Sequence, residues 1–337
     1  MEKKPLVIAQ QGHFWTGIQE FATNSGTIAI GAMSVQYQIP QELKYPFPLV
    51  FIHGGGGQGC EFFSTPDGRP GWSQYFLSQG FATYIVDRAG HGRSPFTEGM
   101  GPEKSLLTYE IVRDLFTNPT VETAGEYAKF AKNWPSEDAL HQFMAGAGPV
   151  IGSLEQTENF ARKGGAELLN QIGPAILITH SMGSPCGWVI ADECPNLVKG
   201  IIAIEPLGPP FSEPFPGLGS LEWGITAQKI AFSPEVNSAE ILKNSNSTIV
   251  GLNQIPIAVV TAEGSFMNNS DPLTVDFLKK HGASVEHILL AQHGIHGNGH
   301  FMIGEKNSDE IAKLLEKWLY LNLPNKANDG FNTQPSK

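Results

Sequence analysis

Ile176-Leu-Ile-Thr179-His-Ser181-Met-Gly183 is the stretch that decides the fold of this chain. It begins with a short apolar run rich in branched side chains, which predicts a strand buried on both faces. A helical pattern follows over residues 184–194, so Ser181 lies on a tight turn between a strand and a helix. A serine on such a turn is exposed as a candidate nucleophile. The alternative role for Ser181 is an ordinary N-cap of the helix, which serine commonly fills.

The turn departs at one position from the G-x-S-x-G pattern of a nucleophile elbow. Gly183 supplies the second glycine of the pattern, whereas Thr179 stands in place of the first. Threonine is small enough to serve there, so the strand before and the helix after Ser181 favour the nucleophile over the N-cap.

Five further runs resemble the strand before Ser181, and each ends in a loop. They span residues 48–53, 81–87, 200–205, 255–261 and 284–291. Buried strands that alternate with helices indicate the α/β class, with a mainly parallel central sheet flanked by helices. Further β-prone runs cover residues 6–9 and 27–37, and a clear final helix covers 308–321.

The domain organisation predicted from this pattern is a single domain over residues 1–324. Two long segments, at about 97–170 and 207–251, do not follow the alternation of strands and helices. Structureless loops of that length are uncommon in compact domains, so we expect both segments to form cap insertions over a site. Residues 325–337 are polar and are expected to form a flexible tail.

Composition excludes several classes of protein. The 337 residues carry 22 Lys and Arg against 33 Asp and Glu, a net charge of −11, so neither nucleic acid nor an anionic membrane surface is an expected partner. The chain has no apolar run of about 18 residues or more, the length that spans a bilayer. The apolar run near Met1 is too short for a secretory leader, so we expect a cytoplasmic protein.

The three cysteines, Cys60, Cys186 and Cys194, are an odd number and have no metal-site spacing. They favour neither a disulfide framework nor a zinc site, although one bridge stays open. Three packed free thiols are the expected state.

The glycine run His53-Gly-Gly-Gly-Gly57 follows the strand at 48–53. Attack on an ester creates a negatively charged oxygen, which backbone N–H donors about 3 Å away can stabilise. We expect the N–H groups of Gly55, Gly56 and Met182 to form this oxyanion hole. A phosphate-binding loop is the alternative, but the run is followed by Gln58 and has no lysine.

A serine nucleophile needs an imidazole to accept its proton and a carboxylate to orient that imidazole. Three histidines follow the last strand, and one of them is expected to be the base. Three carboxylates are candidates for the acid, among which Glu205 has an apolar context where a lone carboxylate is costly. The histidines are His293, His296 and His300, and the carboxylates are Glu205, Glu263 and Asp271.

The order of the glycine run, elbow, acid and histidine resembles the α/β-hydrolase superfamily over nearly the whole chain. The turn Asp87-Arg-Ala-Gly-His-Gly-Arg-Ser94 is also typical of that superfamily. The motifs Thr65-Pro-Asp-Gly-Arg-Pro-Gly-Trp72 and Gly297-Asn-Gly-His-Phe-Met302 look like those of the bacterial esterase 713 family.

The closer resemblance implies a triad of Ser181, His300 and Glu205, with the acid after an unusually early strand, and it implies a homodimer. The chain departs from that family in the oxyanion loop, where two adjacent cysteines are replaced by glycines within the run from Gly54 to Gly56. The main-chain donors survive this change, but a role of the cysteine pair does not carry over.

The expected activity is that of a serine hydrolase that cleaves a carboxylic ester or lactone through an acyl-enzyme. This chemistry needs no metal and no organic cofactor, and its partner is a small-molecule substrate. Two alternatives stay open, because the fold also hosts C–C bond cleavage and lyase enzymes as well as ligand-binding proteins.

Overall fold

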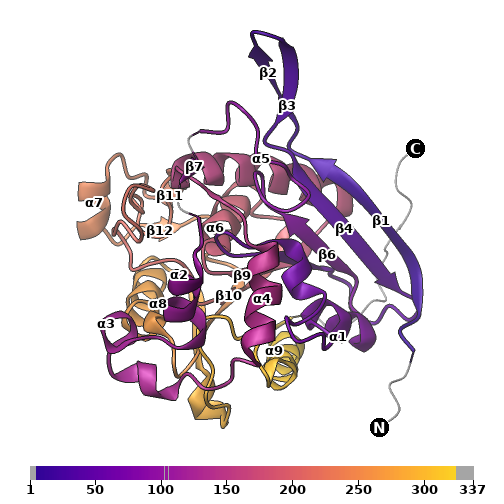
Figure 1. Cartoon of the computed structure of the whole chain (residues 1–337). Helices are drawn as coiled ribbons and strands as arrows, with labels where there is room; N and C mark the ends of the chain where they lie inside the picture. Colours follow the sequence, from indigo (N-terminus) through magenta and orange to yellow (C-terminus); the bar gives the residue numbers. More distant parts are fainter. Residues whose placement is uncertain (1–4, 102, 105, 324–337) are drawn as a thin grey trace.

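An eight-stranded sheet forms the centre of the molecule in a computed structural model, which describes residues 5–101, 103–104 and 106–323 (Figure 1). The strand order is β1-β4-β6-β5-β9-β10-β13-β14. The strands from β6 to β14 are parallel, and β4 pairs antiparallel with both β1 and β6. The predicted mainly parallel sheet is therefore confirmed. The strands are β1 (Ile8–Thr16), β4 (Met33–Pro40), β5 (Leu49–Ile52), β6 (Thr83–Asp87), β9 (Ala175–His180), β10 (Val198–Ile204), β13 (Pro256–Thr261) and β14 (Ser284–Leu289).

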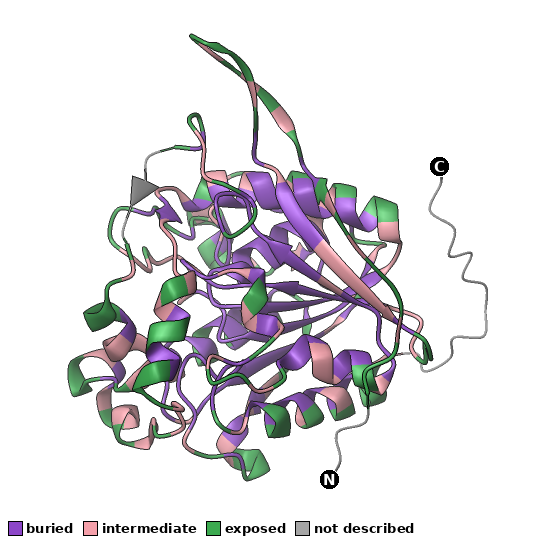
Figure 2. Ribbon diagram, turned by 45° about the vertical axis from the view of Figure 1, so that its right-hand side comes forward, coloured by how far each residue is buried: buried purple, intermediate pink, exposed green. Residues whose placement is uncertain are grey.

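Helices cover both faces of the sheet (Figure 2). Side chains of the inner strands pack into one hydrophobic core on each face. Val50 of β5 packs in one core and the next residue, Phe51, packs in the other. This alternation follows from the two-residue period of a strand, and it explains why the buried strands read as continuous apolar runs. The first core includes side chains of α5 (Leu154–Ile172), α6 (Gly183–Glu193) and α8 (Asp271–Lys280), and the second those of α1 (Trp72–Gln79) and α9 (Ser308–Asn322).

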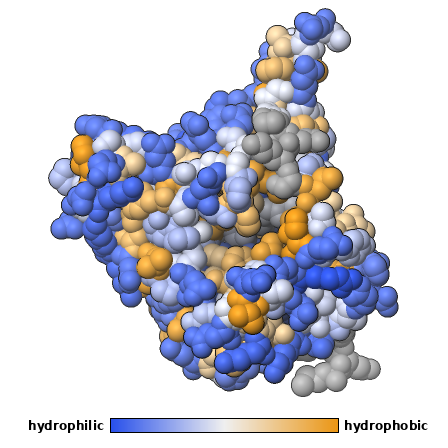
Figure 3. All heavy atoms as spheres, turned by 60° about the vertical axis from the view of Figure 1, so that its left-hand side comes forward, coloured by the Kyte–Doolittle hydropathy of each residue, from blue (hydrophilic) through white to orange (hydrophobic). Residues whose placement is uncertain are grey.

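Short helices and strands occur in both segments expected to be insertions, joined by turns and irregular loops. Helix α5 is an exception within 97–170, because it packs against α6 and strand β1 and so belongs to the layer flanking the sheet. On the side of the molecule that carries α3 and α7, hydrophobic side chains gather around a hollow (Figure 3). The short elements are β7 (Glu103–Lys104), α2 (Tyr109–Val112), the π-helix η2 (Arg113–Thr117), α3 (Val121–Ala124), the 3-10 helix η3 (Gly125–Phe130), α4 (Glu137–Gly146), β8 (Val150–Ile151), β11 (Phe232–Ser233), α7 (Ala239–Asn244) and β12 (Thr248–Ile249).

The N-terminal β region differs from its prediction. The run expected at 27–37 is divided between β3 (Gly26–Ile30) and β4, because Gly31 takes a φ of +70° and breaks the strand. A Cβ at Gly31 would lie 2.4 Å from the ring of Phe160, so a larger residue does not fit there. Strand β3 instead pairs with β2 (Gln19–Thr23) in a hairpin that projects from the body (Figure 1).

The remaining predictions concern the cysteines, membrane-spanning helices and the C-terminal tail. Cys60, Cys186 and Cys194 are all free. Within the described residues, no helix combines the length and apolar character that crossing a bilayer requires. The tail predicted at 325–337 lies outside the described residues.

Candidate active site

Ser181 occupies the turn between β9 and α6 in a left-handed backbone conformation, with a φ of 50°. Such a conformation is costly for a non-glycine residue and persists only where its surroundings enforce it. Here the N–H of Ser181 donates to the Ile204 carbonyl at 2.9 Å, and the Ser181 carbonyl accepts from Ser184 at 2.9 Å and from Leu207 at 3.2 Å. The turn is therefore held by the neighbouring strand β10 as well as by its own helix.

Close packing explains the residue types around this turn. A Cβ at Gly183 would lie 2.6 Å from the carbonyl oxygens of both Ile52 and His53, so only glycine fits there. Thr179 is accommodated in place of the usual glycine because its methyl group faces Gly187, where a Cβ would lie 2.7 Å away. Its hydroxyl also forms a 2.8 Å hydrogen bond with Ser184 Oγ.

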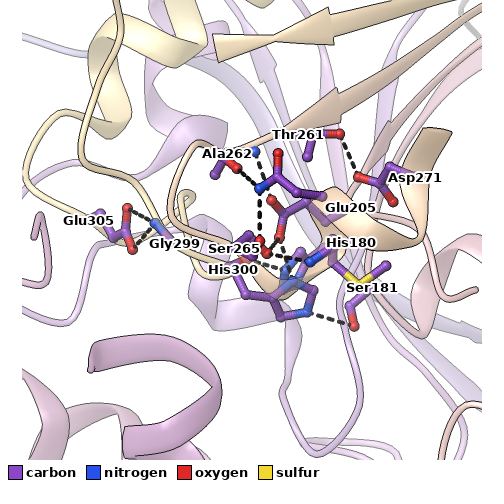
Figure 4. Close-up of polar contacts among 12 residues, drawn as sticks. His180, Ser181, Glu205, Thr261, Ala262, Ser265, Asp271, Gly299, His300 and Glu305 are labelled. Atoms are coloured by element: carbon purple, nitrogen blue, oxygen red, sulfur yellow. Dashed lines mark hydrogen bonds and ion pairs between the residues drawn. The ribbon is translucent and has the colours of Figure 1, made fainter. Parts of the chain in front are cut away.

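Ser181, His300 and Glu205 form a continuous hydrogen-bonded chain (Figure 4). The hydroxyl Oγ of Ser181 lies 3.0 Å from His300 Nε2, and His300 Nδ1 lies 2.5 Å from Glu205 Oε2. All three residues are buried, with Ser181 9% exposed. This geometry brings together the serine, histidine and glutamate that the resemblance implied.

Glu205 lies after β10 and is fully buried. Besides His300, it accepts hydrogen bonds from the Ala262 N–H and the Ser265 hydroxyl, both at 2.7 Å. Burial raises the pKa of Glu205 above its usual range, and these two hydrogen bonds to its oxygens oppose the shift by favouring the carboxylate. Burial lowers the pKa of His300 to about 3, so its imidazole is neutral at pH 7 and can accept a proton.

The other candidate groups lie in different contacts. His293 and His296 are exposed, and His296 Nδ1 lies 3.1 Å from Glu263 Oε2. Asp271 is buried and accepts a hydrogen bond from the Thr261 hydroxyl at 2.5 Å. None of these groups is hydrogen-bonded to Ser181 or His300.

The glycine loop lies directly beside the serine turn. A Cβ at Gly54 would lie 3.3 Å from Ser181 Cβ, and one at Gly55 would lie 2.2 Å from Met182 Sδ. Among the described residues, the N–H groups of Gly55, Gly56 and Met182 donate to no other protein group. The glycine loop therefore packs against Ser181 and Met182, and its Gly55 and Gly56 N–H groups are not used in hydrogen bonds to the described residues.

Two groups outside the predicted triad and oxyanion hole hold the loop of His300, and one of them, Glu305, is not predicted from the sequence. The buried carboxylate of Glu305 accepts from the Gly299 N–H at 2.9 Å and from the Asn298 side chain at 2.6 Å. On the other side, His180 Nε2 donates to the His300 carbonyl at 2.9 Å. Glu305 follows the apolar run 301–304, and a carboxylate in such a context was the signal already used for Glu205.

The surroundings of His300 are aromatic. The ring of Phe116, from the π-helix η2, stacks on the imidazole with a centroid distance of 5.4 Å, and the ring of Phe266 lies 4.7 Å away. No cluster of three or more metal-ligating side chains occurs in the described parts of the chain.

Comparisons with known proteins identify the family and the fold. The model of a family described as "Alpha/beta hydrolase family" matches residues 49–314. A protein named "Probable secreted lipase phiG", from Fungal sp. (strain ATCC 74256), is 36% identical over 310 residues, which cover 85% of each chain. The solved structure of a protein described as a novel bacterial esterase has a TM-score of 0.67 at 21% identity, over 95% of this chain and 98% of its own. The last likeness confirms the predicted fold.

The packing at Gly183 predicts a large loss of stability on a small substitution. We expect Gly183→Ala to lower the free energy of unfolding by about 1–3 kcal/mol, because its methyl group meets two backbone oxygens that cannot move independently. Urea denaturation followed by circular dichroism measures the effect. Gly148→Ala is the matched control, since a Cβ there meets nothing within 4 Å. Equal stability of the two variants would contradict the packing argument.

Proposed function

The chain belongs to the alpha/beta hydrolase family, and on that basis we propose that it is a serine hydrolase that cleaves carboxylic esters or lactones. The observation that carries the proposal is the hydrogen-bonded chain from Ser181 through His300 to Glu205, next to unused backbone donors. The printed names of a probable lipase and an esterase among similar proteins support an ester as the substrate.

In the first half of the proposed reaction, Ser181 Oγ attacks the carbonyl carbon of the substrate. His300 Nε2 takes the hydroxyl proton as the Oγ–C bond forms, and Glu205 stabilises the resulting imidazolium through Nδ1–H. The tetrahedral intermediate collapses when the bond to the leaving oxygen breaks. His300 returns the proton to that oxygen, which leaves as an alcohol and gives an acyl-enzyme on Ser181.

The backbone donors act on the charge that develops during this step. The N–H groups of Gly55, Gly56 and Met182 would bind the carbonyl oxygen as it becomes an oxyanion. A preorganised donor is worth more inside a buried site than in water, and losing one typically costs about 10²–10³ in kcat. Glycine at positions 55 and 56 lets the main chain approach the substrate closely.

The second half repeats the chemistry with water. His300 takes a proton from a water molecule, whose oxygen attacks the acyl carbon, and the proton then passes to Ser181 Oγ as the carboxylic acid leaves. Each step uses only groups of this chain and water. A lactone follows the same course, except that alcohol and acid remain in one molecule.

The aromatic surroundings of His300 favour a substrate with an apolar group next to the ester. Phe116 and Phe266 both contact the imidazole, and Met182 and Leu207 beside the serine turn pack in a separate apolar cluster. The homodimer and the cytoplasmic location remain predictions.

Covalent labelling tests the nucleophile directly. We expect a fluorophosphonate to add one phosphonyl group per chain, found by mass spectrometry on the peptide that contains Ser181. Ser181→Ala should block both this labelling and the turnover of a p-nitrophenyl ester, whereas Ser184→Ala serves as the neighbouring-serine control and should remain labelled. No labelling of Ser181 would argue for a pocket that only binds, and labelling without ester turnover would argue for a different reaction at the same serine.

The assignment of Glu205, after strand β10, as the acid of the triad gives a second test. Glu205→Gln should lower kcat/KM for the same ester by about 10³–10⁴, because an amide cannot stabilise the imidazolium. Asp271→Asn is the matched control, because the Asp271 carboxyl is buried and accepts a hydrogen bond from Thr261 but forms none with Ser181 or His300. Wild-type activity in Glu205→Gln together with loss in Asp271→Asn would reverse the assignment.

A further inference from the structure

Arg88 is a buried arginine whose guanidinium forms no ion pair with the carboxylates that the structure describes. It follows β6 and is 2% exposed. The arginine ion pairs found among the described residues involve Arg69, Arg93, Arg113 and Arg162, so Arg88 pairs with no described carboxylate. Burying a charge without a partner is expensive, because the interior replaces water poorly. The groups that the guanidinium contacts therefore indicate what this charge does.

The main contact of Arg88 is the carbonyl of Gly54 in the glycine loop. Nη2 of Arg88 donates to that oxygen at 2.6 Å, and His53 Nδ1 donates to the same oxygen at 2.8 Å. The backbone N–H of Arg88 donates in turn to His53 Nε2 at 3.0 Å. Arg88 thus contacts the loop twice, once directly and once through the imidazole of His53.

The Gly54 carbonyl belongs to the peptide unit whose N–H is that of Gly55. In a planar trans peptide the C=O and the N–H point in opposite directions, so fixing one fixes the other. A cation at the carbonyl end also adds to the peptide dipole and makes the opposite N–H a stronger donor. That N–H belongs to the residue that packs against Met182, beside Ser181.

We propose that Arg88 is a positioning residue for the oxyanion hole, which orients and polarises the Gly54–Gly55 peptide from behind. The inference rests on the proposed function, since it assigns Arg88 a part in stabilising the same oxyanion. Of the two side chains that donate to the Gly54 carbonyl, Arg88 and His53, only the guanidinium of Arg88 is charged. Burial and the charge of Arg88 hold the pKa of His53 well below its usual range, so His53 orients the carbonyl as a neutral ring.

Arg93, the other arginine of the same turn, makes different contacts from those of Arg88. Arg93 pairs with Asp87 at 2.7 Å and is 39% exposed in its side chain, and it has no contact with the glycine loop. The two arginines therefore offer a matched pair of substitutions within one turn.

Arg88→Met tests the proposal, because methionine is apolar and fills much of the same volume. Replacing a buried charge by an apolar side chain often leaves stability unchanged or raises it, so we expect the thermal midpoint to fall by no more than about 3 °C. We expect kcat/KM for a p-nitrophenyl ester to fall about tenfold to a hundredfold, less than the loss of a whole donor. Arg93→Met should keep kcat/KM close to that of the wild type.

A second measurement distinguishes a loss of oxyanion stabilisation from a general loss of order in the site. An alkyl trifluoromethyl ketone adds to the serine and places an oxyanion in the same hole. Its inhibition constant should rise in Arg88→Met by the same factor by which kcat/KM falls. An unchanged inhibition constant, or wild-type kcat/KM, would overturn the proposal.

The failure of this inference and that of the proposed function are distinguishable. If the wild-type chain is not labelled at Ser181 by a fluorophosphonate, the proposed function fails. If the wild type is labelled and Arg88→Met is labelled at the same rate, only the role of Arg88 fails. Should Arg88→Met not fold, Arg88→Gln carries the test, with losses in both readouts expected and wild-type values overturning the role.

Discussion

The left-handed backbone of Ser181 is the constraint on which the rest of the site depends. A φ of 50° turns the serine hydroxyl away from the sheet and toward His300. The turn is possible because Gly183 lies against the end of β5 and because β10 accepts the Ser181 N–H. The same close approach brings the glycine loop that follows β5 beside the hydroxyl. Ser181 and the glycine loop are thus positioned together by the close contact of Gly183, at the start of α6, with the end of β5.

The site also contains two buried carboxyl groups that are held by hydrogen bonds. Glu205 accepts three hydrogen bonds, and Glu305 holds the loop that presents His300. Burial raises the pKa of each above its usual range, and the hydrogen bonds oppose that shift. Such networks stabilise a unique arrangement when fully satisfied, and they are costly when one member is lost. Arg88 differs because its main partner is a backbone carbonyl rather than a carboxylate.

The strands, the serine turn and the set of candidate acids and bases could be predicted because their signals are local in the sequence. Apolar runs mark the strands, and a strand–serine–helix junction marks Ser181. The choice among three histidines and three carboxylates came from a resemblance, because the partners of Ser181 are 24 and 119 residues away. Gly31 and Arg88 were not singled out, since the φ of one and the contact of the other with Gly54 arise only from tertiary packing.

An activated aryl carbamate is the sharpest probe of whether Ser181 carries the acyl group in the proposed reaction. Carbamoyl-serine intermediates are slow to hydrolyse, so the adduct accumulates and can be located by mass spectrometry. We expect one phenol to be released and one carbamoyl group to be bound per chain, on the peptide that contains Ser181. Phenol release with the carbamoyl group on another residue, or with none bound to Ser181, would rule out Ser181 as the acyl carrier.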